Sequence, residues 1–130
     1  MKYLIIPNLL AVGMHHWGHR HLEVGLGYRV KREPENPKDP NAVAILYDGE
    51  RKAYLKKNHS FVITRILKMN ISNVIRLKPK EDALVKNKHV GPQQLCTIGL
   101  KVNEEINLKS ATDLLKLHGF QFEIKDAKIK

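Results

Sequence analysis

Short runs of apolar residues, separated by glycine, proline and asparagine, define the predicted elements of this chain. Strands are predicted over residues 9–17, 28–32, 42–47, 52–55, 74–77 and 95–102, and residues 120–124 alternate once more. Asp48 and Gly49 are typical of a tight hairpin turn, which joins the third strand to the fourth. Residues 79–93 are polar, with two prolines and a glycine, and predict a long exposed loop.

Two other segments have helical spacing. A helix is predicted over residues 61–69, with Asn58 or Ser60 as its cap. Its apolar positions on one face are Val62, Ile66 and Met69. A capping-box pattern at Ser110-Ala111-Thr112-Asp113 predicts the start of a second helix, which ends at Gly119. Several short strands with two helices predict a mainly β fold with α additions, in the form of a small, partly open β-barrel.

The composition adds a strong positive charge to this picture. The chain has 130 residues, with 23 lysines and arginines against 13 aspartates and glutamates, and its formal net charge is +10 at pH 7. Its length predicts a single domain over residues 1–130. The charge favours a polyanionic partner, which is nucleic acid, an anionic membrane or an acidic protein. Cys96 is the single cysteine, which excludes an internal disulfide, and the apolar run around it predicts a core position.

The N-terminal apolar residues, from Tyr3 to Met14, superficially resemble a signal peptide. Pro7 and Asn8 interrupt that run, and four histidines follow where a cleavage site would have small residues. No apolar stretch approaches the length of about 18 residues that a membrane-spanning helix needs. We therefore expect a soluble, intracellular protein without a membrane partner, nuclear in a eukaryote and cytoplasmic in a bacterium.

The most informative segment is residues 32–46. Three prolines restrict its backbone, and the apolar run of residues 42–47 follows directly. The segment thereby places Asn36, Asp39 and Asn41 on a stiff turn just before a strand. Rigid loops that present polar groups beside a sheet often carry binding sites. A well-made turn without a ligand explains the same residues, so both interpretations stay open.

Landmarks over nearly the whole chain match one known family. They are Val12-Gly13-Met14, Arg32-Glu33-Pro34, Asn36-Pro37, Asp39, Asn41-Ala42-Val43-Ala44, Leu55-Lys56-Lys57 and the tail from Leu114 to Phe120. On these motifs the chain resembles a HIRAN domain, a small module of proteins in DNA damage tolerance and of bacterial proteins, most closely the one in helicase-like transcription factor. The resemblance covers about residues 9–123 and is most specific in the central run.

The resemblance implies an OB-like fold, related to the oligonucleotide-binding barrel, and a non-catalytic module that grips the 3′ end of single-stranded DNA. Asp39 would receive the free 3′-hydroxyl, and Lys56 or Lys57 would hold phosphate. A hydroxyl donates a hydrogen bond, whereas an internal phosphodiester is anionic, so a fixed carboxylate accepts the first and repels the second. Trp17 lies where the family has stacking aromatics, and each stacked base contributes roughly 1–3 kcal/mol.

Other family positions carry different residue types here. His15 stands in place of an arginine, and His16 in place of the first of two aromatics. Lys38 replaces the aromatic of the Asn-Pro-aromatic-Asp turn, where it can pair with Asp39. Tyr54 occupies a position that can be histidine, and a late-strand phenylalanine falls near Leu100. The DNA-binding set that the resemblance implies is His15, His16, Trp17, Asn36, Lys38, Asp39, Asn41, Tyr54, Lys56, Lys57 and Leu100.

The histidine cluster supports a second interpretation, a metal-binding module. His19 and His21 would share one face of a strand as half of a zinc or nickel site, but no nearby cysteine or well-placed carboxylate completes it. The same cluster can stack on DNA bases instead. A third interpretation is a protein-interaction domain for an acidic partner.

Enzymatic function has less support than binding. The chain has no phosphate loop, nucleophile elbow or HExxH motif, so we expect no catalysis and no cofactor. A metal-dependent nuclease would need several converging carboxylates, and Glu33 and Glu35 beside the turn are interpreted as solvated charges. We expect single-stranded DNA or DNA ends as the partner, with a helicase or nuclease as an associated protein.

Overall fold

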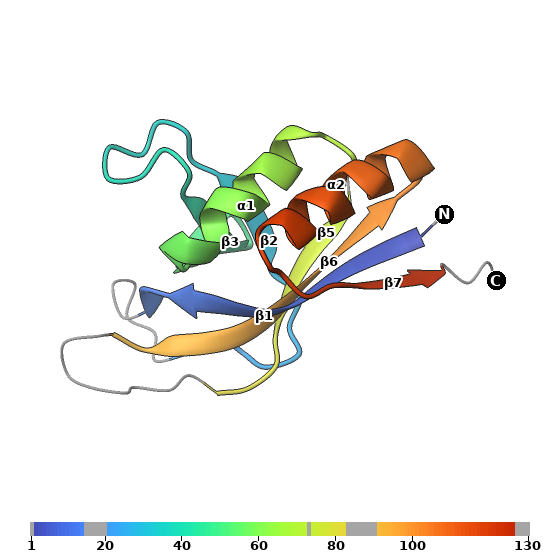
Figure 1. Cartoon of the computed structure of the whole chain (residues 1–130). Helices are drawn as coiled ribbons and strands as arrows, with labels where there is room; N and C mark the ends of the chain where they lie inside the picture. Colours follow the sequence, from blue (N-terminus) through green and yellow to red (C-terminus); the bar gives the residue numbers. More distant parts are fainter. Residues whose placement is uncertain (1, 15–20, 73, 83–90, 127–130) are drawn as a thin grey trace.

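The computed structural model describes residues 2–14, 21–72, 74–82 and 91–126, which form seven strands and two helices (Figure 1). In chain order they are β1 (Lys2–Val12), β2 (Arg29–Arg32), β3 (Val43–Tyr47), β4 (Glu50–Leu55), α1 (Lys57–Lys68), β5 (Ile75–Pro79), β6 (Gln93–Val102), α2 (Glu105–Leu117) and β7 (Glu123–Asp126). The strands follow the spatial order β2-β3-β4-β1-β6-β5, and β7 pairs with β1. All of these pairs are antiparallel.

Strand β1 is central and changes its neighbours along its length. Its first residues pair with β6 and β7, whereas its last two pair with β6 and β4. Between Ile6 and Leu9 the register with β6 shifts, because three steps along β1 match two along β6. Asn8 in this bulge has a φ of 61°, in the left-handed region that asparagine tolerates better than most residues. Since a bulge bends its strand, β1 can serve both parts of the sheet.

The sheet curls toward a barrel but is not closed. Tyr28, just before β2, forms an isolated antiparallel bridge with Leu77 of β5. Backbone hydrogen bonds of 2.7 and 2.9 Å join the two residues. In the described residues this bridge, together with a hydrogen bond from the backbone N–H of Gly25 to the carbonyl of Pro79, links the two ends of the strand order without forming a ladder. The expected mainly β fold, a partly open barrel with two helices, is confirmed.

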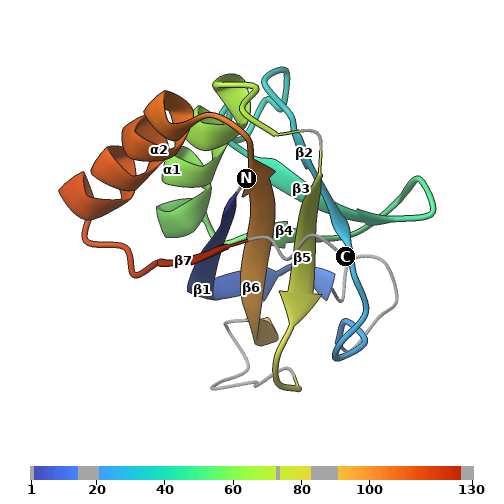
Figure 2. The ribbon, with the colours of Figure 1, turned by 90° about the vertical axis from the view of Figure 1, so that its right-hand side faces the viewer.

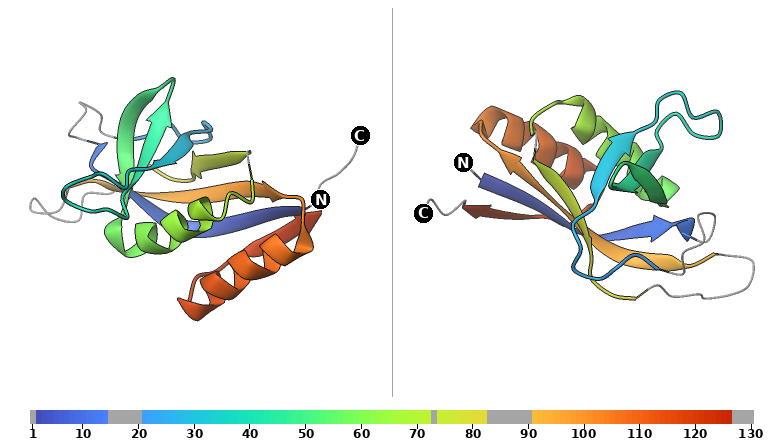
Figure 3. Two further views of the ribbon diagram at one scale, coloured as in Figure 1. Left: turned by 90° about the horizontal axis from the view of Figure 1, so that it is seen from above. Right: turned by 180° about the vertical axis from the view of Figure 1, so that it is seen from behind.

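Both helices lie side by side on one side of the sheet (Figures 2 and 3). Their buried faces pack on a core built from the inward side chains of the strands. The largest fully buried hydrophobic side chains are Leu4, Ile6, Leu9, Met14, Leu22, Ile45, Ile63, Leu77, Ile98, Leu100 and Leu115. Cys96 of β6 is also buried, as predicted, and burial raises the pKa of its thiol to about 12. This thiol is therefore a packing group and not a nucleophile.

Several strands have other bounds than the sequence predicted. β1 begins at Lys2 rather than at residue 9, because Leu4 and Ile6 are buried and Pro7 lies at the bulge, where a strand tolerates proline. It ends at Val12. The last strand, β7, lies at Glu123–Asp126 instead of residues 120–124, because Phe120 and Phe122 pack against the core before the strand starts.

Helix α1 begins earlier than predicted. Its first residue is Lys57, after Lys56, and no side chain caps it, so Asn58 and Ser60 lie inside the first turn. Of the predicted apolar face, Val62 and Ile66 are buried, whereas Met69 is exposed at the C-cap, after the last residue of the helix. No acidic residue lies in the first turn, which leaves the positive end of the helix dipole without an anionic side chain of its own.

Helix α2 begins at Glu105, five residues before the predicted capping box. Leu108 extends the buried stripe that Ala111 and Leu115 form, and this packing decides where the helix starts. The Ser110 hydroxyl donates to the carbonyl of Ile106, a bond typical of serine within a helix. The predicted C-terminal glycine is confirmed, since Gly119 has a φ of 72°. Within the described residues, neither helix is long and apolar enough to cross a membrane.

Candidate nucleic-acid interface

An open groove of about 910 Å³ lies between the loop that follows β2, strand β4 and the start of α1. We call it the loop groove. It is lined by Val12, Lys31, Arg32, Glu33, Pro34, Glu35, Asn36, Pro37, Lys38, Asp39, Ala42, Arg51, Tyr54, Leu55 and Lys57. The antiparallel pairing of β2, β3 and β4 folds these distant segments together. Of the predicted binding residues, the loop groove brings together Asn36, Lys38, Asp39, Tyr54 and Lys57.

The loop itself is held by short-range hydrogen bonds. The backbone N–H of Glu33 donates to the carbonyl of Ala42 at 2.9 Å and closes the base of the loop. The Asn36 side chain accepts from the backbone N–H of Lys38, and Asp39 Oδ1 accepts from that of Asn41, both at 2.9 Å. The stiff polar turn predicted from the sequence is thus present. In the part of the chain that the structure describes, the other Asp39 oxygen, Oδ2, has no hydrogen-bond partner.

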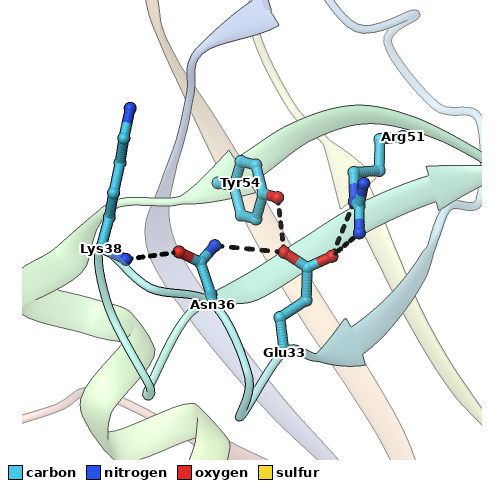
Figure 4. Close-up of polar contacts among 5 residues, drawn as sticks. All are labelled: Glu33, Asn36, Lys38, Arg51 and Tyr54. Carbon is cyan, nitrogen blue, oxygen red and sulfur yellow. Dashed lines mark hydrogen bonds and ion pairs between the residues drawn. The ribbon is translucent and has the colours of Figure 1, made fainter.

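The Glu33 carboxylate ties the loop to β4 (Figure 4). The Tyr54 hydroxyl donates to Oε1 at 2.5 Å, and Asn36 Nδ2 donates to the same oxygen at 3.3 Å. Arg51 Nε donates to Oε2 at 2.6 Å, and the Arg51 guanidinium also forms an ion pair with that oxygen. The Glu33 side chain is only 11% exposed. Its interpretation as a solvated charge is therefore wrong, because it anchors the wall of the loop groove.

These contacts also fix the protonation states of the pair. Burial by itself raises the pKa of Glu33, but hydrogen bonds from Tyr54, Arg51 and Asn36 outweigh it and hold the pKa below its usual value of 4.5. Burial and the bond to Glu33 raise the pKa of the Tyr54 hydroxyl. Near neutral pH, Glu33 is ionised and Tyr54 is a neutral donor. The Tyr54 ring is thereby held at one place in the loop groove.

Positive side chains outnumber negative ones along the loop groove. Since Arg51 and Glu33 neutralise each other, the remaining charged side chains are Lys31, Arg32, Lys38 and Lys57 against Glu35 and Asp39. Lys38 is exposed, and its side chain extends away from the Glu33 contacts in Figure 4. Among the described residues it forms no ion pair, so it does not make the contact with Asp39 that its position in the sequence allows.

A second depression, of about 510 Å³, continues the loop groove at the beginning of α1. We call it the helix-start groove, and it is lined by Asp39, Asn41, Lys56, Lys57, Asn58 and Phe61. Asp39 and Lys57 line both depressions. Lys57 is exposed, whereas Lys56 is half-buried and its backbone N–H donates to the carbonyl of Leu10. Lys57 is therefore better placed than Lys56 to meet a ligand that spans the two.

Other predicted residues do not join these grooves. Leu100 of β6 is 2% exposed and pairs with Leu4 and Ile75 inside the sheet, so its predicted contact with DNA is wrong. His15, His16, Trp17 and His19 lie outside the described residues. His21 is exposed. No group of three or more metal-ligating side chains occurs within residues 2–14, 21–72, 74–82 and 91–126.

The sequence does not predict the contributions of Glu33, Arg51 and Phe61 to the two grooves. In the sequence, Glu33 is part of the Arg32-Glu33-Pro34 landmark and is interpreted as a solvated charge, and nothing links it to Arg51. Phe61 was counted as the start of a helix. It lies one turn after Lys57, so a helix that begins at Lys57 places both on the same face.

Comparisons with known proteins identify the fold. The chain is similar to the crystal structure of the HIRAN domain of human HLTF, with a TM-score of 0.73 and 20% identity over 94% of this chain and 96% of that one. It is also similar to the NMR structure of the HLTF HIRAN domain in its DNA-bound conformation, with a TM-score of 0.56 and 22% identity over 88% and 93%. No family model and no curated protein sequence matches the chain. The resemblance to HIRAN domains is confirmed at the level of the fold.

Proposed function

We propose that this chain is a HIRAN-family module that binds single-stranded DNA without catalysis, and that it prefers strands with a free 3′-hydroxyl. The observation that carries the proposal is the meeting of Asp39, Tyr54 and Lys57 in one open groove of this fold. A HIRAN domain of the same fold has a DNA-bound conformation. An intracellular setting and an associated helicase or nuclease belong to the same proposal.

Electrostatics supply the sequence-independent part of the binding. Lys31, Lys38 and Lys57 are exposed along the loop groove and are not paired with acidic groups among the described residues. Each is free to neutralise a backbone phosphate and release condensed counterions, so affinity falls as salt rises. The start of α1 at Lys57 adds the partial positive charge of a helix N-terminus at the same end of the groove.

Asp39 supplies the preference for an end. Its Oδ1 holds the turn through Asn41, which fixes the carboxylate in place, and Oδ2 remains to accept a hydrogen bond from a ligand. A terminal 3′-hydroxyl donates such a bond, whereas a 3′-phosphate brings a second negative charge to the same place. Tyr54, held by Glu33, places an aromatic ring in the lining of the loop groove, where it can contact a base.

The test compares two labelled strands of one sequence, one ending in a 3′-hydroxyl and one in a 3′-phosphate, titrated against the protein at several salt concentrations. We expect the hydroxyl-ended strand to bind at least about 10-fold more tightly, since a charge-assisted hydrogen bond contributes about 1.5–3 kcal/mol. Asp39→Asn should remove most of this difference. Asp82→Asn, the same substitution at an exposed aspartate that lines neither groove, should preserve it.

The outcomes separate the levels of the proposal. Equal affinity of the unmodified protein for both strand ends would reject the reading of 3′ ends but keep DNA binding. No binding of either strand at low salt would reject DNA binding and favour the acidic protein partner. Loss of binding on addition of a chelator would favour the metal-binding alternative.

A further inference from the structure

A third depression continues the two grooves past α1. It has a volume of about 420 Å³ and lies between the bulge of β1, the first turns of α1 and the residues after α2. It shares Asn58 and Phe61 with the helix-start groove, which in turn shares Asp39 and Lys57 with the loop groove. A continuous path therefore runs from the loop groove, across the start of α1, to the end of α2. We call this third depression the aromatic pocket.

Four of the residues that line the aromatic pocket carry aromatic rings. Phe61 and His118 meet edge to face with ring centroids 5.1 Å apart, and His59 and Phe120 do so at 5.8 Å. Each pair joins a residue of α1 to one of the first residues after α2, which ends at Leu117. All four residues are partly exposed and line the pocket, while the Nε2 atom of His118 is buried and has no hydrogen-bond partner among the described residues. This arrangement resembles a platform on which a planar group can stack.

Uncharged amides complete the rim. Asn8 of the bulge donates a hydrogen bond to the side chain of Gln121, and Asn58 lines both this pocket and the helix-start groove. His59 accepts a hydrogen bond from the backbone N–H of Leu10 through Nδ1, and burial, with Lys56 nearby, lowers its pKa. The lining residues include no lysine, arginine, aspartate or glutamate. An uncharged planar group with hydrogen-bonding edges fits such a pocket better than a phosphate does.

We propose that the aromatic pocket binds a further nucleobase of the same strand, upstream of the nucleotides in the loop groove. This inference rests on the proposed function. Charged and aromatic surfaces alternate along the path: Lys57 meets phosphate at the start of α1, and Phe61 follows one helical turn later. One turn advances about 5.4 Å, within reach of adjoining nucleotides of a strand. The aromatic pocket thus lengthens the binding site beyond the end-recognising groove.

The experiment measures affinities of unmodified protein and variants for oligothymidylates of 3 and 10 nucleotides, both with free 3′-hydroxyls. The short strand fills only the loop groove and its surroundings, and the long strand reaches the aromatic pocket. Phe120→Leu removes a ring that lines only the aromatic pocket. We expect it to weaken the 10-nucleotide strand about 5-fold or more and to leave the 3-nucleotide strand within about 2-fold.

A second variant protects the test against misfolding, because Phe120 also packs against the core. Gln121→Glu places a negative charge on the exposed rim and should weaken the long strand selectively. Asn103→Glu adds the same charge at an exposed position that lines none of the three depressions. It should leave the ratio of the affinities for the two strands unchanged.

The results discriminate the two proposals. If Gln121→Glu and Asn103→Glu affect the long strand equally, the aromatic pocket does not bind a base and the inference is overturned. If the unmodified protein binds both strands with a free 3′-hydroxyl preference but gains nothing from length, the proposed function stands and only this inference falls. If it binds neither strand, the proposed function itself fails.

Discussion

Replacement of Glu33 by glutamine tests the anchor of the loop groove. Glutamine keeps the shape of the side chain but removes its charge. Hydrogen bonds to a charged acceptor contribute about 1.5–3 kcal/mol and bonds to a neutral one about 0.5–1.5 kcal/mol, so weakening the Tyr54 bond costs about 1 kcal/mol. If the amide oxygen of the new glutamine accepts the hydrogen bond from Tyr54, its NH2 group faces Arg51, and two donor groups then meet without an acceptor. The ion pair with the solvent-exposed Arg51 adds little to this cost.

The measurement is thermal unfolding at a series of pH values. A loss of about 1 kcal/mol lowers the melting temperature of a domain of this size by about 3–6 °C. Glu35→Gln is the matched control, since Glu35 is exposed in the same loop and forms no hydrogen bond or ion pair among the described residues. It should melt like the unmodified protein at pH 7.

The pH series gives the sharper result. The pKa of Glu33 is lower in the folded state than its usual value of 4.5. As the pH falls through 4.5, the unfolded chain therefore takes up a proton at Glu33 before the folded protein does. The stabilisation from Glu33 is therefore complete above about pH 4.5 and is lost as the pH falls through the folded pKa. Unmodified protein and Glu33→Gln should differ at pH 7 and converge in acid. A difference that is absent at pH 7, or that is the same at every pH, would refute the anchoring role.

Two further predictions concern single side chains. Lys57→Ala should weaken the binding of hydroxyl-ended and phosphate-ended strands alike and reduce the salt slope of binding by about one. Lys68→Ala, at the far end of α1, should change neither the affinity nor the slope. Equal slopes in the two variants would remove Lys57 from the interface. Leu100→Ala should lower the free energy of unfolding, measured by urea denaturation, by about 2–5 kcal/mol. The DNA affinity of the folded variant should be unchanged. A variant of unchanged stability that has lost DNA binding would contradict the place of Leu100 in the core.

The sequence predicted the elements whose signals are local. The hairpin of β3 and β4 followed from alternation and from Asp48 and Gly49, which have φ values of 53° and 79°, as a tight turn requires. The polar turn was equally predictable, because Asn36 and Asp39 bond to backbone groups two residues further along. These contacts depend on neighbours that the sequence itself makes adjacent.

Contacts between distant segments were not predictable in the same way. Glu33 acquires its role from Tyr54 and Arg51, and their positions depend on the register between β3 and β4, which shifts between Ile45 and Leu46. The aromatic pocket depends on packing between α1 and the end of α2. The start of α2 shows the same competition, since burial of Leu108 in the core outweighed a local capping pattern.

The central position of β1 has a consequence for how the domain folds. Lys2 pairs with Val102 and with Asp126, so the first strand of the chain is completed by segments about a hundred residues later. Such a high contact order predicts slow folding, on the millisecond to second scale, because the loop-closure entropy is lost before the pairing compensates for it. During synthesis, β1 must wait for β6 to leave the ribosome. Until then the apolar side chains and unpaired backbone groups of β1 are exposed. We therefore expect this chain to need protection from aggregation during that interval.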